Sequence, residues 1–393
     1  MKEGWTYKKL GEVATFVKDG DWIESKDQSE NGIRLIQTGN VGNGVFKLKD
    51  DKPHYITEET MTRLGCTEIF KGDCLVSRLP DPVGRACILP DIGCRMITAV
   101  DCSIIRFGVD YLPQFFVGYT QSSNYRNSIN NNTTGTTRKR ISRKNLERIL
   151  IPVPPMAEQE RIVAELDLLS GIIEKKKEQL KAYDQLAQSI FYTMFGDPID
   201  NPKGWEVKKL GEVGELQRGS GLSKKDLTED GFPCILYGQV HTRFGAYTNK
   251  HIACIPQELV STAKIAHFGD IVMAITSEDV EGSCKSVAWM GNYDIAVGSD
   301  AAIYRHTLNP IYVSYYTQTK AFYFEKAKYA KGFKVTHIST KEIAKIPIPV
   351  PPLSLQQEFA EKVEAIERQK ALVQQSIEET QTMFDYTMDK YFG

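Results

Sequence analysis

Short apolar segments bounded by turn residues recur through the first 150 residues of the chain and again after residue 197. Examples are residues 34–37, 74–77 and 270–275, which are framed by glycine, aspartate or proline. Such segments predict β-strands, and a Gly-Asp pair before an apolar run is typical of a turn that leads into a strand. Two aromatic-rich stretches, 111–125 and 310–329, predict helices. We therefore predict an α+β fold with β-rich globular parts.

A second pattern, with apolar residues alternately four and three positions apart, follows each globular part. This heptad spacing predicts two long helices that pair with each other; the alternative is that each helix packs on its own globular part. Ile-Pro-Val-Pro-Pro precedes each helix and enforces extended backbone there. A helix of about 38 residues would be roughly 57 Å long, enough to act as a spacer. The residues predicted to pair are Ile162, Leu166, Leu169, Ile173 and Leu180 in the first helix, and Phe359, Val363, Ile366, Val373 and Ile377 in the second.

The chain is an internal repeat. The segment Trp5-Thr-Tyr-Lys-Lys-Leu-Gly-Glu-Val returns as Trp205-Glu-Val-Lys-Lys-Leu-Gly-Glu-Val, and later matches, such as His54 with His251, are 197 positions apart. Framework positions match between the copies, whereas the residues between them differ. We predict a β-rich domain at 1–153, a helix at 154–196, a second β-rich domain at 197–350 and a second helix at 351–393. Such a tandem repeat can form a pseudo-twofold object.

Composition and charge narrow the class of protein. The chain has 49 Lys and Arg against 50 Asp and Glu, so a surface that binds DNA would have to be a local patch. There is neither an apolar run long enough for a transmembrane helix nor a signal-peptide pattern, and we expect a soluble, cytoplasmic protein without membrane contact. The eight cysteines form no CxxC pair, which predicts reduced, mostly buried thiols.

Sequence motifs for catalysis are missing. We find no phosphate loop, no dinucleotide fingerprint, no nucleophile elbow and no HExxH, and the six histidines have no metal-ligand spacing. We therefore expect no catalytic residue, no metal and no cofactor bound by this chain. Asn309-Pro-Ile-Tyr faintly resembles the Asn-Pro-Pro-Tyr loop of adenine methyltransferases. It lacks the second proline and a preceding glycine-rich cofactor loop, so we interpret it as a turn before a helix.

Basic residues gather at matched positions of the two copies, just before each Pro-rich run. Lysine and arginine attract phosphates, and arginine can also read guanine in the major groove. A single basic stretch is more often a solvated face, but a matched pair favours DNA binding. The ends of the strands near 77 and 276 are further places to present side chains. The candidate DNA-contacting residues are Arg78, Thr136, Thr137, Arg138, Lys139, Arg140, Arg143, Thr276, Ser277, Lys331, Lys334 and His337.

These features together resemble the specificity (S) subunits of type I restriction–modification enzymes. The resemblance covers the whole chain and is carried by the order of its parts. These parts are the Trp-x4-Leu-Gly-Glu-Val openings, the segments 19–26 and 34–40, Gly-Asp-Cys-Leu-Val-Ser-Arg, Ile-Pro-Val-Pro-Pro-x3-Gln-Glu and Phe-Gly-Asp-Pro. The second copy departs slightly at 352–358, where Gln356 keeps the register of Gln159.

The resemblance implies two target recognition domains, each reading one half of a split double-stranded DNA sequence, and two spacer helices paired as an antiparallel coiled coil. It implies two methyltransferase subunits, which carry S-adenosylmethionine and methylate adenine at N6. Motor–nuclease subunits that use ATP and Mg can join for cleavage. It implies that the specificity subunit itself has no active site. Two other classes stay open on the residues alone: a coiled-coil scaffold without DNA binding, and a self-contained methyltransferase.

Overall fold

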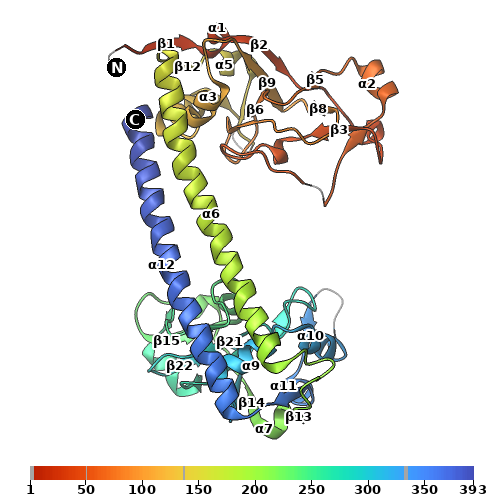
Figure 1. Ribbon diagram of the computed structural model, residues 1–393, viewed down its shortest axis with the longest axis vertical. Coiled ribbons are helices and arrows are strands. Elements are labelled where there is room, and N and C mark those ends of the chain that lie inside the picture. Colours follow the sequence, from red (N-terminus) through yellow and green to blue (C-terminus); the bar gives the residue numbers. More distant parts are fainter. Residues whose placement is uncertain (1–3, 50, 136–137, 332–334) are drawn as a thin grey trace. The chain divides into compact units, whose positions relative to one another are not determined.

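The computed structural model describes residues 4–49, 51–135, 138–331 and 335–393. The chain divides into two compact units (Figure 1). Unit 1 contains Met1–Lys177 and Gln375–Gly393, and unit 2 contains Glu178–Gln374. Each unit therefore contains one β-rich domain together with one half of each long helix. The boundaries predicted from the sequence lie at the starts of both helices and at the end of the first, whereas this division by contacts passes through each long helix.

The β-rich domain of unit 1 is built from two four-stranded sheets. One sheet is antiparallel, in the order β2-β9-β6-β7, and the other, in the order β4-β3-β8-β5, contains one parallel pair, β3 with β8. A separate antiparallel ribbon joins β1 to β12, which brings the start of the domain to the Pro-rich segment before the first long helix. The strands are β1 (Thr6–Lys9), β2 (Ala14–Asp19), β3 (Ile33–Ile36), β4 (Tyr55–Ile56), β5 (Glu68–Ile69), β6 (Cys74–Ser77), β7 (Ala86–Ile88), β8 (Met96–Thr98), β9 (Cys102–Phe107), β10 (Thr133–Thr134), β11 (Arg140–Ile141) and β12 (Leu150–Val153).

Short helices connect these strands, and their ends follow ordinary capping chemistry. The hydroxyls of Ser122 and Ser142 accept hydrogen bonds from the first turns of α4 and α5, and Gly65 ends α2 in the left-handed conformation. The helices of this domain are α1 (Leu10–Val13), α2 (Glu58–Leu64), α3 (Pro113–Tyr119), α4 (Ser123–Asn131) and α5 (Arg143–Glu147), with 3₁₀ turns at Ser25–Asp27 and Thr38–Asn40.

Unit 2 repeats this plan with additional strands. Its sheets have the orders β14-β23-β19-β21-β16 and β17-β15-β22-β18, and two ribbons pair β13 with β25 and β20 with β24. The strands are β13 (Glu206–Lys209), β14 (Gly214–Arg218), β15 (Phe232–Ile235), β16 (Tyr247–Thr248), β17 (Cys254–Ile255), β18 (Lys264–Ala266), β19 (Ile271–Ala274), β20 (Thr276–Ser277), β21 (Ser286–Trp289), β22 (Ile295–Val297), β23 (Ala301–His306), β24 (Thr336–His337) and β25 (Pro347–Val350). The helices are α7 (Leu210–Val213), α8 (Tyr237–Thr242), α9 (Pro310–Tyr316), α10 (Lys320–Ala327) and α11 (Thr340–Ile343), with 3₁₀ turns at Lys224–Asp226 and Gln257–Thr262.

The predicted short strands are confirmed: residues 34–37, 74–77 and 270–275 coincide with β3, β6 and β19. The two aromatic-rich stretches are helical, but each forms two short helices, not one. The break falls at the caps Ser122 and Thr319, whose hydroxyls accept hydrogen bonds from the next helix. A helix-capping residue inside an aromatic run is the physical reason for the break.

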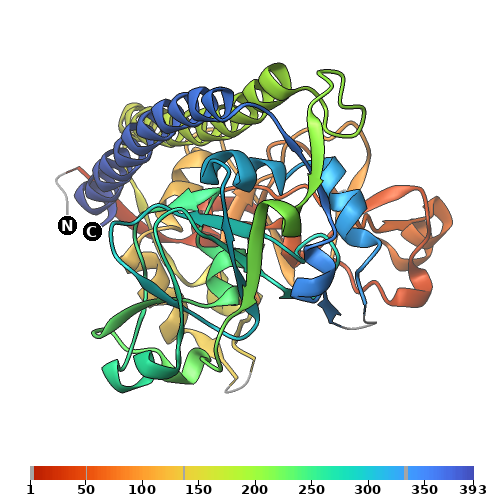
Figure 2. The same cartoon turned by 90° about the horizontal axis from the view of Figure 1, so that it is seen from below.

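The two long helices, α6 (Met156–Phe195) and α12 (Leu353–Phe392), each have 40 residues. In unit 1, the first half of α6 and the last half of α12 lie side by side and run in opposite directions (Figures 1 and 2). Arg161 donates to the Tyr391 hydroxyl at 2.9 Å, and the Lys176 ammonium lies 3.1 Å from the Thr380 hydroxyl. Because the partner number falls as the α6 number rises, the pairing is antiparallel.

The other helix halves pair in the same sense inside unit 2. The Lys370 ammonium lies 2.7 Å from a carboxylate oxygen of Asp184, and the rings of Phe191 and Phe359 are 5.6 Å apart. Lys176 and Lys370 interrupt the apolar seam in sequence. Both nevertheless bind polar groups of the facing helix, so they fasten the helices where apolar contact is missing.

The predicted seam is largely buried, but the helices pack on more than each other. Ile162, Leu166, Leu169, Ile173, Phe359, Val363, Ile366 and Ile377 are buried, whereas Leu180 and Val373 are half-buried. Ile162 and Leu166 join a core formed with α3 and the end of α12, and Phe359 joins the corresponding core of unit 2. Pairing between helices is therefore confirmed. The alternative, packing on the helix's own domain, is also realised at the ends of the seam.

Candidate nucleic-acid interface

The basic segments lie on the same small hairpin in both units. In unit 1, β10 and β11 place Thr134 opposite Arg140, and in unit 2 an equivalent bridge places Lys331 opposite His337. A backbone hydrogen bond at an equivalent point joins each hairpin to the rest of its domain. The Ile141 amide donates to the carbonyl oxygen of residue 78, and the Ile338 amide donates to that of residue 275. Residues 197 positions apart in the repeat therefore make the same backbone hydrogen bonds at the two candidate sites.

An aspartate lies beside each hairpin at an equivalent point of the fold. In unit 1 the Asp101 carbonyl accepts from the amide of residue 78, and in unit 2 the Asp300 carbonyl accepts from the amide of residue 275. The Asp101 carboxylate is 2.7 Å from the Arg140 guanidinium, whose side chain is 44% exposed. Arg140 therefore combines a fixed ionic partner with access to solvent.

Arg78, a candidate DNA contact in the sequence, lies inside its domain. Its side chain is only 5% exposed, and its guanidinium lies 3.3 Å from Asp19 and donates to the Val100 carbonyl at 2.6 Å. Burial lowers the pKa of Arg78, and the charge of Asp19 opposes this shift. The guanidinium is thus held by partners inside the domain, and its contact with DNA stays a prediction. The backbone register also matches Arg78 with Ile275, not with the Thr276-Ser277 pair.

The remaining candidates of unit 1 lie on or next to the hairpin. Arg138 and Lys139 are exposed between β10 and β11. Arg143 opens α5 and lies 3.3 Å from the Glu147 carboxylate one turn later. Thr136 and Thr137, like Lys334 of the second copy, lie outside the described residues. The described part thus presents a cluster of cations at one edge of the domain.

In unit 2, His337 and Thr276 form a polar chain to the aspartate, where unit 1 has an ion pair. Nδ1 of His337 is 3.2 Å from the Thr276 hydroxyl, which in turn donates to the Asp300 carboxylate at 3.4 Å. Lys331 lies 2.7 Å from Glu342 of α11. The Lys331 ammonium and the Ser339 amide hold the pKa of Glu342 at about 2. Lys331 is therefore partly neutralised by its own domain.

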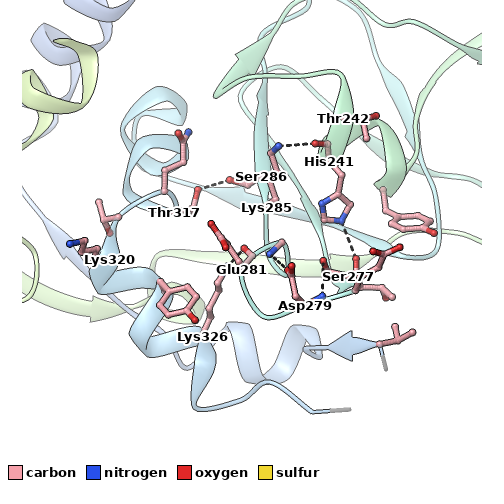
Figure 3. Close-up of a pocket in the computed structure, with 18 residues that line it drawn as sticks. His241, Thr242, Ser277, Asp279, Glu281, Lys285, Ser286, Thr317, Lys320 and Lys326 are labelled. Carbon is pink, nitrogen blue, oxygen red and sulfur yellow. Dashed lines mark hydrogen bonds between the residues drawn. The ribbon is translucent and has the colours of Figure 1, made fainter. Parts of the chain in front are cut away.

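A hollow of about 1140 Å³ opens beside the ribbon of β20 and β24 in unit 2 (Figure 3). Thr276 and Ser277 border it, and His241 points toward them, with its Nε2 3.1 Å from the Thr276 carbonyl oxygen. The lining contains Lys285, Lys320 and Lys326 and also Glu278, Asp279 and Glu281, so its positive and negative charges balance. Sequence reasoning identified Thr276 and Ser277 but missed these other residues, because they come from three separate loops and helices.

A buried arginine, Arg85, lies at the corresponding point of unit 1. Arg85 corresponds to Lys285 in the order of the strands, and its guanidinium donates to the carbonyl oxygens of Thr38, Val41, Leu79 and Pro82. Lys285 makes a single such bond, to the His241 carbonyl, and is exposed. The two domains therefore share a framework but present different surfaces at this point.

Several residues singled out in the sequence have structural partners. The matched histidines bond inside their domains, His54 to Gln28 and His251 to Tyr293, both at 2.7 Å. Asn309 caps α9, as expected for a turn before a helix. Six of the eight cysteines are buried and all are free thiols. Within the described ranges, no three His, Cys, Asp or Glu side chains gather as metal ligands, and no helix has the length and apolar character to cross a bilayer.

Comparison with known protein families agrees with this architecture. Residues 2–182 and 202–381 each match the family model described as the type I restriction modification DNA specificity domain. The chain therefore belongs to this family and carries two copies of its domain. Family membership does not favour a coiled-coil scaffold that never binds DNA.

Individual relatives carry the same description. The chain is 27% identical, over 60% of its length, to the type I restriction enzyme MjaVIII specificity subunit of Methanocaldococcus jannaschii, and 29% identical, over 58%, to the MjaIX specificity subunit of that organism. The matched regions span 59% and 55% of those proteins. A solved type I restriction–modification S subunit from M. genitalium covers the whole chain at 15% identity with a TM-score of 0.53, which shows a shared fold.

Proposed function

We propose that this chain is the DNA specificity subunit of a type I restriction–modification complex. Each β-rich domain reads one half of a split double-stranded DNA target. The observation that carries the proposal is the matched hairpin: two specificity domains hold equivalent hairpins on equivalent framework bonds, while the side chains that surround them differ. A shared scaffold with different surfaces is what two readers of different sequences require.

We further propose that the chemistry belongs to partner subunits and not to this chain. Two methyltransferase subunits bring S-adenosylmethionine and methylate adenine at N6. Where motor–nuclease subunits join, they bring ATP and Mg for cleavage. The specificity subunit is then a non-catalytic reader that works in the cytoplasm, where chromosomal DNA is accessible.

The direct test is to map methylated adenines across the genome in cells with and without this gene, in a host that supplies the methyltransferase partners. We expect a split motif to be methylated only when the gene is present. A second arm uses the assembled complex in vitro on DNA fragments that contain or lack this motif. Methylation that does not depend on this chain, or that recognises an unsplit motif, would overturn the proposal.

We also propose that the helices set the unspecified gap between the half-sites, because α6 and α12 are continuous and both contribute to both units. Removing one heptad from each, residues 175–181 and 372–378, removes about 10.5 Å of helix and keeps the apolar seam in phase. We expect a shorter gap or loss of methylation. A four-residue deletion, which breaks the phase, is the matched control. A fully active complex with the original gap would contradict this role.

A further inference from the structure

The two hairpins each hold one side chain against an aspartate that the framework fixes. Arg140 and His337 occupy the same hairpin position, opposite Thr134 and Lys331. Arg140 contacts the Asp101 carboxylate directly, whereas His337 reaches its aspartate through a threonine hydroxyl. The side chain at this position is therefore linked to an aspartate in both units, although the linking residues differ.

We propose that Arg140 and His337 are the paired base-reading side chains of the two domains. In this assignment Arg140 donates to a guanine, and the free ring nitrogen of His337 accepts from the exocyclic amino group of an adenine or a cytosine. Asp101, and Thr276 with Asp300, are positioning residues that act through them. The inference rests on the proposed function and deepens it by naming the residues that determine specificity.

Arg140 differs from Arg138 and Lys139 because the Asp101 carboxylate contacts its guanidinium. Arg138 and Lys139 are exposed, and within the described part of the chain no ion pair holds them, so they suit phosphates, which need charge but little orientation. Reading guanine needs an oriented guanidinium fork, because two N–H groups must meet O6 and N7 together. The 2.7 Å contact between them joins Oδ1 of Asp101 to Nη2 of Arg140, and this oxygen makes no well-directed hydrogen bond inside the described chain. The other edge of the fork is left for a base.

His337 is oriented by a chain of hydrogen bonds. The Thr276 hydroxyl has one proton, which it donates to Asp300, so it accepts the Nδ1–H of His337. This leaves Nε2 of the neutral ring as an acceptor, which is complementary to an amino group at the edge of adenine or cytosine. Guanine presents only acceptors at this edge of the major groove and is disfavoured by a neutral Nε2.

The test for unit 1 compares Arg140→Ala with Arg138→Ala in the complete complex with its methyltransferase partners. Methylation is measured on a DNA library with both half-sites randomised, and sequencing reports each base preference separately. Arg140→Ala should relax preference for guanine at one position of one half-site by about five-fold to a hundred-fold. Arg138→Ala, the matched control, should lower affinity equally for all sequences.

The positioning role has its own readout. Asp101→Asn keeps the shape but removes the charge, and it should relax the same guanine position less strongly than Arg140→Ala. Combining the two should relax that position no further than Arg140→Ala alone, because Asp101 acts through Arg140. Asp101→Asn that alters other positions, or adds to the effect of Arg140→Ala, would overturn the positioning role. Unchanged recognition of the other half-site shows that the complex is folded.

The corresponding test for unit 2 uses His337→Ala, with Thr276→Val to remove the hydroxyl while keeping its shape. Both should relax one position of the other half-site, and the wild-type base at that position separates the two alternatives, adenine or cytosine. A guanine or thymine there would overturn the assignment of His337. So would a His337→Ala variant that keeps every preference.

The outcomes separate this inference from the proposed function. A wild-type complex that methylates no split motif would contradict the proposed function itself. A wild-type complex with a split motif, combined with an Arg140→Ala variant that loses affinity uniformly and keeps every base preference, would contradict only the inference. Complete loss of binding by Arg140→Ala would also contradict it, because an exposed reader of one base cannot account for the whole affinity.

Discussion

Units 1 and 2 build the same hairpin on the same framework bonds but stabilise it with different charges. In unit 1 a buried arginine, Arg78, lies between Asp19 and Asp101. In unit 2 the position of Arg78 is taken by the apolar Ile275, and an exposed arginine, Arg218, lies 3.8 Å from Asp300. The comparison teaches that the backbone scaffold is conserved between the copies, while the electrostatics around it vary.

The surfaces next to the two hairpins also carry different charged side chains. Arg85 of unit 1 is buried and donates to four backbone carbonyls, whereas Lys285 of unit 2 is exposed and lines a hollow. A guanidinium has five donors in a fixed fork and can satisfy several carbonyls at once, which an ammonium on a flexible stem does less well.

The strongest test of the comparison exchanges most of the first reader. Replacing residues 14–135 with the corresponding segment of another specificity domain keeps the framework and changes the intervening loops. We expect one half of the methylated sequence to change, except at a guanine read by Arg140, which lies outside the exchanged segment, and the other half to stay the same, as read by methylome sequencing. Simultaneous change of both halves would show that the units do not read independently.

A second prediction concerns the charge exchange around Arg78. Arg78→Ile leaves Asp19 and Asp101 without their shared cation, and we expect unit 1 to lose about 1–3 kcal/mol, below the usual cost of breaking a fully buried pair because both carboxylates are partly exposed. Adding Asp19→Arg recreates the arrangement of unit 2 and should restore part of the loss. Hydrogen exchange of the full chain, read at β6 and β9, measures this. Equal stability of wild type and Arg78→Ile would show that the cluster contributes nothing.

This arginine also shows how far sequence reasoning reached. The repeat, the strands, the long antiparallel helices and the matched basic segments follow from periodicity, motif spacing and family resemblance. Arg78 looked like an exposed reader, because it follows a strand and precedes a loop. Its burial depends on Asp19 and Asp101, which are distant in sequence, so no local pattern reveals it. The hollow of unit 2 was missed for the same reason.

A third prediction compares phosphate attraction by the two hairpins. Arg138→Ala and Lys139→Ala should each lower the slope of log K against log salt by about 0.9, if each neutralises one phosphate. Lys331→Ala in unit 2 should lower the slope by less, because Lys331 is already paired with Glu342. Binding of the complete complex to its target at several salt concentrations gives the slopes. If all three variants had the same slope as wild type, the hairpin cations would not contact DNA phosphates.

The smallest expected effect concerns acid. Ser339 and Glu342 form a capping box on α11, while the matched helix α5 has Asn145, which does not titrate, in place of Glu342. The folded pKa of Glu342, about 2, lies below its ordinary value of 4.5, so its contribution to stability is present above pH 4.5 and lost as the pH falls toward 2. Hydrogen exchange between pH 5 and 2.5 should therefore show α11 loosening before α5. Glu342→Gln, which removes the titration, should abolish the difference; if α11 still loosens first in that variant, the acid sensitivity of unit 2 arises elsewhere.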